Sequence, residues 1–432
     1  MNFLALFCTF TTKPLALCHF MPNFNKNQYY PWVICVAGLL VLVVVNGLTT
    51  SSLSVFDETL MNEFNISRTE LKIKDSITNL VATVLILVSG MLIDKFKVKR
   101  VMLFGVLVLG LGFLVFSKIA GLLGMYFTHF LFGLAYISAG SVPCIILVSS
   151  WFHTKRGLAL GITLIGTSLG GFIFPNILTH FIQTIGWRDT FQYLAMLPLI
   201  LFVIILTLVR SSPSELGLKP YGFKKHPDTH ADNHSLLNQG MDFKDAIRTP
   251  VFWMISGCGF MTFYSVVAVV SNLFLHMRGF YFDTQTASAA LSLYFLLALI
   301  GKFIISTLSD YMNVYAVFTA SAFCMTLGMM GFATMDKSII FYAVGLTALS
   351  WGGIYTLYNV MIVKTFGLKS AGKINGVISA FESSGSFLGP ILTGFIFDQT
   401  HSYQLAFMVI SGVMVITTLL SLRFRSYAMK SS

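Results

Sequence analysis

Charged residues are scarce in this chain of 432 residues. Asp, Glu, Lys and Arg together make up 10% of it, whereas 56% of the residues are hydrophobic and the mean hydropathy is +0.79. Soluble globular domains carry about 25% charged residues, so this composition excludes an ordinary soluble domain and predicts a protein of the lipid bilayer.

Motifs for metal, redox and nucleotide chemistry are also missing. No GxxxxGK[ST] phosphate loop is present, which argues against an ATP-driven pump, and no cofactor is expected. No cluster of His, Asp or Cys lies near a predicted membrane face, as a membrane enzyme would need. The six cysteines show no CxxC spacing and predict neither a metal site nor a disulfide framework. They are Cys8, Cys18, Cys35, Cys144, Cys258 and Cys324.

The start of the chain lacks the features of a signal peptide. Residues 1–10 are apolar, but no basic segment precedes them and no small-residue cleavage site follows. Met21 opens a polar lead into the first long apolar run. Translation from Met21 is therefore an alternative hypothesis for the start of the protein.

Twelve apolar runs are long enough to cross a bilayer, since a span needs about 20 residues. They cover residues 32–56, 73–93, 101–117, 122–150, 158–183, 190–209, 251–276, 286–308, 314–334, 338–363, 374–397 and 403–422. The longest polar stretch, 210–249, falls between the sixth and seventh runs and is expected to tether two six-helix halves. The sequence predicts an all-α membrane protein with an N-terminal segment (1–30), a first half (31–210), a linker (211–249), a second half (250–423) and a tail (424–432).

The net charge of +11 follows from topology and not from nucleic-acid binding. If the N-terminus is cytoplasmic, the segments on that side hold 20 Lys and Arg residues. The opposite loops hold seven, namely Arg68, Lys72, Lys74, Lys118, Arg188, Arg278 and Lys337. This positive-inside bias predicts that both termini and the linker are cytoplasmic, in what is expected to be a bacterial inner membrane. No nucleic-acid partner is expected.

The second half of the chain repeats the first. Asp94 matches Asp310 one residue off a common offset of 215 residues. With an even number of helices per half, both halves have the same orientation, and the working site is expected at the seam between them. This architecture is typical of a transporter. The identities at the offset of 215 are Gly157/Gly372, Gly161/Gly376, Ser168/Ser383, Gly170/Gly385, Phe172/Phe387 and Pro175/Pro390.

A glycine, an aspartate four residues later and a basic cluster end the second predicted span. This pattern, from Gly90 through Asp94 to Arg100, resembles the signature of the major facilitator superfamily. Gly90 lets helices approach, and Asp94 can pair with a cation or cap the next helix. The resemblance implies a cytoplasmic gate made by Gly90, Asp94, Lys95 and Arg100. Asp310 repeats the aspartate in the second half, without a basic cluster after it, and predicts a weaker second latch.

Further motifs are similar to those of the monocarboxylate transporters and their bacterial oxalate/formate antiporter relatives. The resemblance runs through nearly the whole chain from about residue 31. It implies a twelve-helix carrier that moves a small carboxylate by alternating access. The matching residues are Trp151, Phe152, Arg156, Gly157, Gly161, Gly170, Pro175, Gly186, Trp187, Arg188, Phe191 and the stretch 210–222.

Two ionisable residues stand inside apolar runs of the second half without a topological reason. Lys302 lies eight residues before Asp310, and Glu382 lies eight residues after Ile374, so each is about 12 Å from the end of its helix. A charge at this depth costs about 2.5 to 3.5 kcal/mol on insertion scales and usually faces a cavity or a partner. Lys302 and Glu382 are therefore expected either to line the substrate site as a pair or to form a fixed salt bridge between two helices.

The resemblance sharpens the expectation for this pair. It implies that Lys302 binds the substrate carboxylate, with Lys in place of the usual Arg, and that Glu382 disfavours a dicarboxylate. Ala298 replaces an expected acidic residue, and the first-helix lysine expected near Ser51 is absent, so proton coupling would need another carrier. Glu382 is the candidate, because a carboxylic acid in low dielectric can hold a proton near neutral pH.

Other polar and aromatic residues on the cavity-lining helices are candidate ligands, although core packing or an interfacial belt explains any single one as well. They are Asn46, Thr49, Asn79, Tyr136, Tyr264, Asn272, Tyr294, Trp351, Tyr355 and Asn359. His129, near the outer end of the fourth span, is expected to be a packing residue. Asp57 and Glu58, at the outer end of the first span, are expected to stay solvated.

The sequence as a whole favours secondary transport of a small, anionic carboxylate, driven by an ion gradient or by exchange. The expected partners are the small-molecule substrate and the bilayer, with a monomer as the simplest state. Export of an amphiphile such as a siderophore or drug is the alternative within transport. A nutrient sensor that binds without transporting is the alternative outside it, although residues 423–432 form only a short tail for signalling.

Overall fold

The computed structural model describes residues 26–223, 240–367 and 369–428. Within these ranges the regular elements are helices. Two isolated β-bridges are also formed, between Phe152 and Tyr221 and between Gly240 and Gly367. The predicted alternative start at Met21 lies outside the described residues, as do Cys8 and Cys18. The free cysteines among the described residues are Cys35, Cys144, Cys258 and Cys324.

Nine α-helices build the first half of the described chain. They are α2 (Lys26–Asn46), α3 (Asp57–Phe64), α4 (Arg68–Phe96), α5 (Val98–Phe116), α6 (Leu122–Ala139), α7 (Ser141–Trp151), α8 (Arg156–Ile185), α9 (Trp187–Leu194) and α10 (Met196–Leu208). A π-helical turn (Gly47–Ser51) and a 3-10 turn (Leu53–Phe56) join α2 to α3. The linker begins with a 3-10 turn (Pro213–Leu216) and ends with α12 (Phe243–Ala246). The second half consists of α13 (Pro250–Gly279), α14 (Thr284–Tyr311), α15 (Val314–Ala333), α16 (Ile340–Phe366), α17 (Ala371–Thr400) and α18 (Gln404–Ala428).

The observed helices agree with the predicted spans. Ten helical segments in the described residues are long and apolar enough to cross a membrane, and α4 makes eleven if its two parts, bent by 61°, count as one span. The remaining predicted span is α17, a continuous helix of 30 residues that contains several Gly and Ser residues and is not among these ten apolar segments. The fourth predicted span is broken at Gly140, between the end of α6 and the start of α7. Glycine is required at this break, because a Cβ would stand 2.2 Å from the carbonyl oxygen of Tyr136.

The sequence repeat is also a repeat in space. In the first half, Gly170 of α8 packs against the backbone of α2 at Val43 and Gly47. In the second half, its counterpart Gly385 of α17 packs in the same way against α13 at Phe260 and Tyr264. The missing Cβ lets each pair of backbones approach closely.

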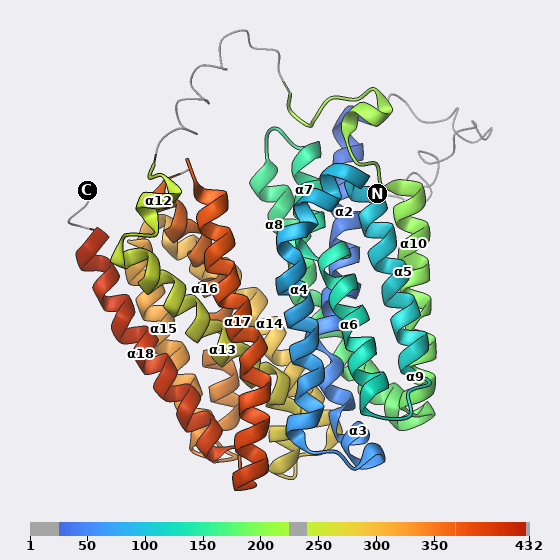
Figure 1. Cartoon of the computed structure of the whole chain (residues 1–432), viewed down its shortest axis with the longest axis vertical. Coiled ribbons are helices and arrows are strands. Elements are labelled where there is room, and N and C mark those ends of the chain that lie inside the picture. The colour runs from blue at the N-terminus through green and yellow to red at the C-terminus, as the bar shows by residue number, and fades with distance from the viewer. Residues whose placement is uncertain (1–25, 224–239, 368, 429–432) are drawn as a thin grey trace.

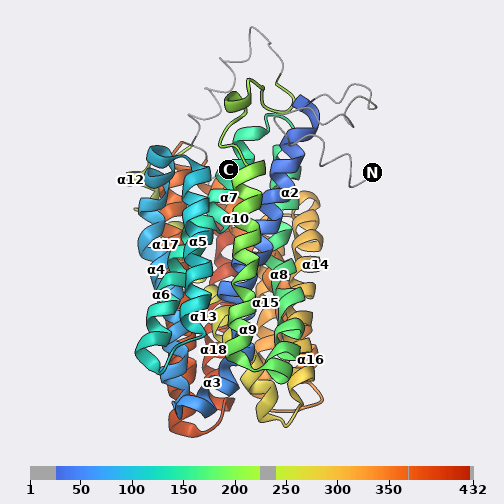
Figure 2. The same cartoon turned by 90° about the vertical axis from the view of Figure 1, so that its right-hand side faces the viewer.

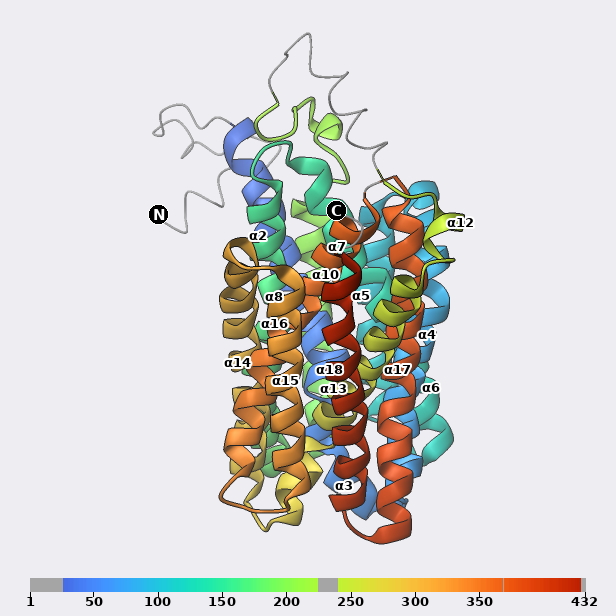
Figure 3. The same ribbon diagram turned by 90° about the vertical axis from the view of Figure 1, so that its left-hand side faces the viewer.

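The two halves stand side by side and converge toward one end. In Figure 1, α2 to α10 form one group and α13 to α18 the other, with α4 beside α17. Figure 2 views the first half, where α5 and α10 lie outermost, and Figure 3 views the second half, where α15 and α18 lie in front. The halves contact each other mainly through α4 with α17 and α8 with α14. We call the end with α3 the α3 end and the end with the linker the linker end.

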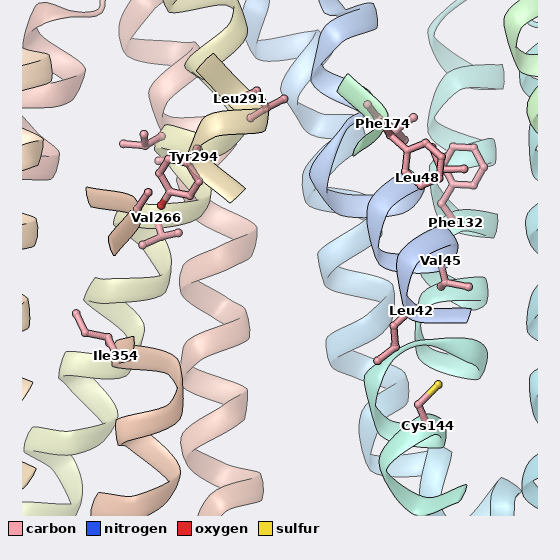
Figure 4. Close-up of a cluster of buried hydrophobic side chains, with 14 of the residues drawn as sticks. Leu42, Val45, Leu48, Phe132, Cys144, Phe174, Val266, Leu291, Tyr294 and Ile354 are labelled. Carbon is pink, nitrogen blue, oxygen red and sulfur yellow. The ribbon is translucent and has the colours of Figure 1, made fainter. Parts of the chain in front are cut away.

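Buried apolar side chains fill both halves of the molecule. Figure 4 shows Leu42, Leu48 and Phe174 of the first half and Val266, Leu291 and Ile354 of the second half on opposite sides of the view. All six side chains are buried.

The described parts of the linker are hydrogen-bonded to the two halves. Its first part bonds to the first half, where Trp151 Nε1 donates to the carbonyl of Arg210 (3.0 Å) and Tyr221 N to that of Trp151 (2.8 Å). Its last part bonds to the second half, where Met241 N donates to the carbonyl of Phe366 (2.8 Å). The linker therefore connects the halves through anchored ends.

Candidate functional site

Polar contacts close the seam at the α3 end. The two carboxylate oxygens of Asp398, on α17, accept hydrogen bonds from the backbone N–H groups of Arg68 (3.0 Å) and Thr69 (2.8 Å) at the start of α4, and one also accepts from the Thr69 hydroxyl (2.5 Å). A carboxylate is favoured here, because the first N–H groups of a helix have no partner within it. Arg278 of α13 pairs with Glu58 of α3 through two bonds of 2.6 and 3.0 Å.

A buried group of four charges lies just inside this closure. Asp57 accepts from Lys72 (2.5 Å) and lies 2.9 Å from the ammonium of Lys74, and Asp75 lies 3.5 and 2.7 Å from the same two ammonium groups. Asp57, Lys72 and Lys74 are almost completely buried. Lys72 also donates to the carbonyl of Ser271 in the second half.

The burial of this group corrects two predictions. Asp57 was expected to stay solvated and does not, because the start of α4 folds back onto the end of the first span. Glu58 is about one-third exposed (34%) but is held by Arg278. Lys72 and Lys74 were assigned to an outer loop, whereas they lie in the first two turns of α4.

Lys302 lies at the middle of the seam. Its ammonium donates to Thr167 Oγ1 (2.9 Å) and Ser168 Oγ (2.8 Å), both on α8 of the opposite half. The expected ion pair with Glu382 is not formed. Within the part of the chain that the structure describes, no carboxylate lies within ion-pair distance of this ammonium. The cation is therefore held only by neutral hydroxyl groups.

Glu382 faces the seam from α17. Its side chain packs over Gly259 of α13, where an added Cβ would stand 3.1 Å from Cγ. Tyr355 of α16 lies close enough to both Glu382 and Tyr136 of α6 to interact electrostatically with each. Asn46 of α2 lies near Tyr136, and its Oδ1 has no hydrogen-bond partner among the described residues. Four predicted ligands from both halves thus surround one region of the seam.

The remaining predicted ligands lie in different surroundings. Trp351 packs against Tyr355, with ring centroids 6.1 Å apart, and against Phe263 at 5.0 Å. Tyr264 is buried beside Phe260. Tyr294 is completely buried in the core of the second half, and its hydroxyl has no hydrogen-bond partner among the described residues. Trp351 is thus connected to the seam, whereas Tyr294 lies in apolar packing.

The predicted gate residues lie at the linker end and are not engaged. Asp94, Lys95, Arg100 and Asp310 are exposed, and none of them forms an ion pair with another described residue. A Cβ added to Gly90 would meet nothing within 4 Å. The described hydrogen bonds between the halves gather at the α3 end and the middle. The structure is therefore closed at the α3 end and unlatched at the linker end.

One basic residue of this cluster contacts the linker. Lys97 pairs with Glu215 across 3.1 Å, and Glu215 also accepts from the backbone of Ser211 (3.1 Å). Burial opposes the charge on Glu215, but the bonds from Lys97 and Ser211 hold the pKa of this carboxyl below its usual range. This contact lies within the first half and its linker.

Comparison with known proteins decides the family. The model of the Major Facilitator Superfamily matches residues 39–390, and a second match covers 255–431. This chain belongs to the Major Facilitator Superfamily. It is 24% identical over 406 residues to the probable L-galactonate transporter of Escherichia coli, covering 86% of this chain and 84% of that protein. It is 23% identical over 402 residues to the hexuronate transporter of Bacillus subtilis, covering 88% and 92%.

The superfamily fold is supported by solved structures. A crystal structure of a mutant of the nucleoside transporter NupG matches with a TM-score of 0.70 at 12% identity, covering 91% of this chain and 99% of that one. The predicted fold class is confirmed, and the protein is a transporter and not an enzyme.

Sequence reasoning missed several polar residues at the seam of this Major Facilitator Superfamily member. Thr167 and Ser168 were not expected to hold Lys302, yet Thr167 is the repeat counterpart of Glu382, since 382 minus 167 is the repeat offset of 215. This equivalence could have identified Thr167 as a candidate site residue from the sequence. Arg68 and Asp398 carried no comparable signal, because charges at the ends of predicted spans are common.

Proposed function

We propose that this protein is a secondary active transporter of a small carboxylate-bearing metabolite, with Lys302 as the main attraction for the anion. The observation that carries the proposal is the unpaired charge of Lys302 at the seam. A buried ammonium without a counter-ion is costly, and a carboxylate would replace two neutral hydroxyl acceptors by a charged one. The names of the two bacterial relatives point to sugar acids, which carry such a carboxylate.

The rest of the site fits an organic anion with hydroxyl groups. Asn46 and Tyr136 from the first half, and Tyr355 from the second, offer hydrogen-bond donors and acceptors around the same region of the seam. Trp351 beside Tyr355 provides an apolar face. Glu382 is the candidate proton carrier for coupled uptake. Its place close to the site, without an ion-pair partner among the described residues, allows it to exist in the protonated form.

We further assign the linker end to the cytoplasm, from the distribution of 20 against seven basic residues. Under this orientation the α3 end faces outward, both termini are inside, and the structure represents a state closed to the outside. The latch residues Asp94 and Asp310 would then act in the opposite state, when the linker end closes. A cysteine at an exposed linker residue such as Lys219 should be labelled from the cytoplasmic side alone.

The substrate proposal is tested by binding and exchange. Purified protein is screened by thermal shift against galactonate, glucuronate, galacturonate, lactate, pyruvate and oxalate, with galactose as the uncharged control. A ligand at 100 times its dissociation constant should add about 2.7 kcal/mol to the native state. Counterflow in proteoliposomes then distinguishes transport from mere binding.

Two variants give matched controls. Lys302→Gln should abolish binding of the anion, because the charge-assisted bond is lost. Lys302→Arg keeps the charge and should retain measurable affinity. If Lys302→Gln binds every anion as tightly as the parent, or if galactose stabilises the protein as well as galactonate does, the carboxylate proposal is refuted.

A further inference from the structure

His276 is buried near the α3 end of α13 without any hydrogen-bond partner. Its residue is 1% exposed, and neither ring nitrogen bonds to another described residue. Four aromatic rings surround it, with centroid distances of 4.6 Å to Phe407, 4.9 Å to Phe280, 5.3 Å to Tyr403 and 6.0 Å to Phe332. An imidazole that makes no hydrogen bond contributes nothing here that phenylalanine could not, so its presence calls for another role.

A cation from the opposite half shares one wall of this cage. The guanidinium of Arg68, on α4, stacks over the ring of Phe397 at 3.5 Å and over that of Tyr403 at 4.6 Å. Tyr403 therefore contacts His276 and Arg68 at once, and Arg68 is held in place by the bond between its own backbone and Asp398. Closure of the α3 end brings this fixed positive charge toward the imidazole.

The other charged groups nearby do not offset this effect. Asp398 from α17 is engaged by the backbone N–H groups of Arg68 and Thr69. Arg278, two residues along α13, pairs with Glu58 from α3. From the turn just before α18 the titratable group is Tyr403, whose hydroxyl donates to Asn272 (3.3 Å). None of these groups gives His276 an acceptor among the described residues.

We propose that His276 is a proton-binding site that opens the α3 end of the transporter. Protonation places a second cation beside Tyr403, next to Arg68, in a cage where no described residue accepts a hydrogen bond from the ring. Separation of the halves at the α3 end relieves the repulsion between the two cations, because it moves Arg68 away and lets water reach His276. This inference rests on the alternating-access part of the proposed function, but it does not depend on the identity of the substrate.

The expected size of the effect follows from linkage. If His276 is uncharged in the closed state and titrates like an ordinary imidazole, near pH 6.5, in the open state, the open-to-closed ratio rises by a factor of about 1 plus 10 to the power (6.5 minus pH). Between pH 8.0 and pH 5.5 the ratio should therefore rise about 11-fold. With the α3 end facing outward, an acidic exterior would favour loading from outside.

The test measures distance and not flux. Spin labels at Asn62→Cys on α3 and Gln404→Cys on α18, both exposed and on opposite halves, report the opening in a background without the native cysteines. Distance distributions are recorded in nanodiscs at pH 8.0 and 5.5 without substrate. The open-to-closed ratio should grow about 11-fold in the parent, and His276→Phe, which refills the aromatic cage, should remove that dependence.

His129 provides the matched control. It is also buried and packed against phenylalanines, but its Nδ1 bonds to Thr78 (2.9 Å) and it lies inside the first half. His129→Phe should keep the pH response. A parent that shows no pH response, or a response that survives His276→Phe and disappears in His129→Phe, would overturn the proposal.

A second variant keeps the test decisive if His276→Phe cannot be purified. Arg68→Gln removes the competing cation while His276 stays, so the open-to-closed ratio should depend less on pH than it does in the parent. An unchanged 11-fold response in Arg68→Gln would show that the guanidinium plays no part. Loss of carboxylate binding in Lys302→Gln is scored separately, so failure of the substrate proposal and failure of this one are distinguishable.

Discussion

Removal of the Asp398 carboxylate should shift the transporter from the closed toward the open state at the α3 end. Asp398 is the most heavily bonded cross-half contact of the described residues, with three bonds of 3.0, 2.8 and 2.5 Å to the start of α4. The substitution Asp398→Ala deletes all three. Within the second half the change should have little effect, because these bonds all reach the other half.

The magnitude follows from the number and exposure of these bonds. A hydrogen bond to a charged group contributes about 1.5 to 3 kcal/mol. The full sum is not expected, because Asp398 is only half-buried and water solvates both the carboxylate and the freed N–H groups when the seam opens. We therefore expect a net shift of about 2 kcal/mol for the set, which changes the ratio of open to closed molecules about 30-fold.

The assay uses the spin-label pair at Asn62 and Gln404 at a fixed pH of 8.0. Asp336→Ala is the matched control, because Asp336 lies at the same end of the same half but bonds within its own turn, to Ser338 N (2.8 Å). The control should leave the distance distribution unchanged. If Asp398→Ala also leaves it unchanged while the protein stays folded, these three bonds do not determine the closure and the reasoning is refuted.

Three further outcomes are expected. Asp57→Ala should destabilise the folded protein by about 3 to 5 kcal/mol in chemical or thermal unfolding, because it leaves Lys72 buried with an incomplete set of counter-charges; a loss below about 1 kcal/mol would contradict this. Gly170→Val should cost about 1 to 3 kcal/mol by forcing α8 away from α2, whereas Gly161→Ala, whose Cβ meets nothing within 4 Å, should fold like the parent. Asp94→Asn should slow counterflow with substrate affinity unchanged, and transport at the parental rate would show that Asp94 is not a latch.

The helices could be predicted because each depends on local composition. Long apolar runs between charged ends give spans whatever their neighbours are, and the observed helices overlap all twelve predicted runs. The breaks could not be predicted in the same way. The run that contains Gly140 is apolar throughout, and the close approach of Gly140 to the carbonyl of Tyr136, which requires glycine, is seen only in the folded helix.

The candidate site was only partly predictable, because an unusual residue can be identified in the sequence whereas its contact partners cannot. Lys302 was found because a charge within an apolar run is rare. Its partners, Thr167 and Ser168, look like any helix hydroxyls, which often bond to their own backbone. The prediction that Lys72 lies in an outer loop was wrong for a related reason. A lysine at the edge of an apolar run looks solvated, and its burial requires Asp57 and the carbonyl of Ser271, 199 residues away.

The remaining predictions concern a state that the structure does not show. Asp94, Asp310 and the small residues Gly157 and Gly372 lie at the linker end, where the last two have no neighbour within 4 Å of an added Cβ. At the α3 end, Asp398 of α17 is bonded to the start of α4 across the seam. A carrier that alternates between two closures needs contact residues at both ends, although only one set is in contact at a time. The sequence therefore contains the contact residues of both states. An alternating carrier that is closed at the α3 end should leave Asp94 and Asp310 at the linker end without partners.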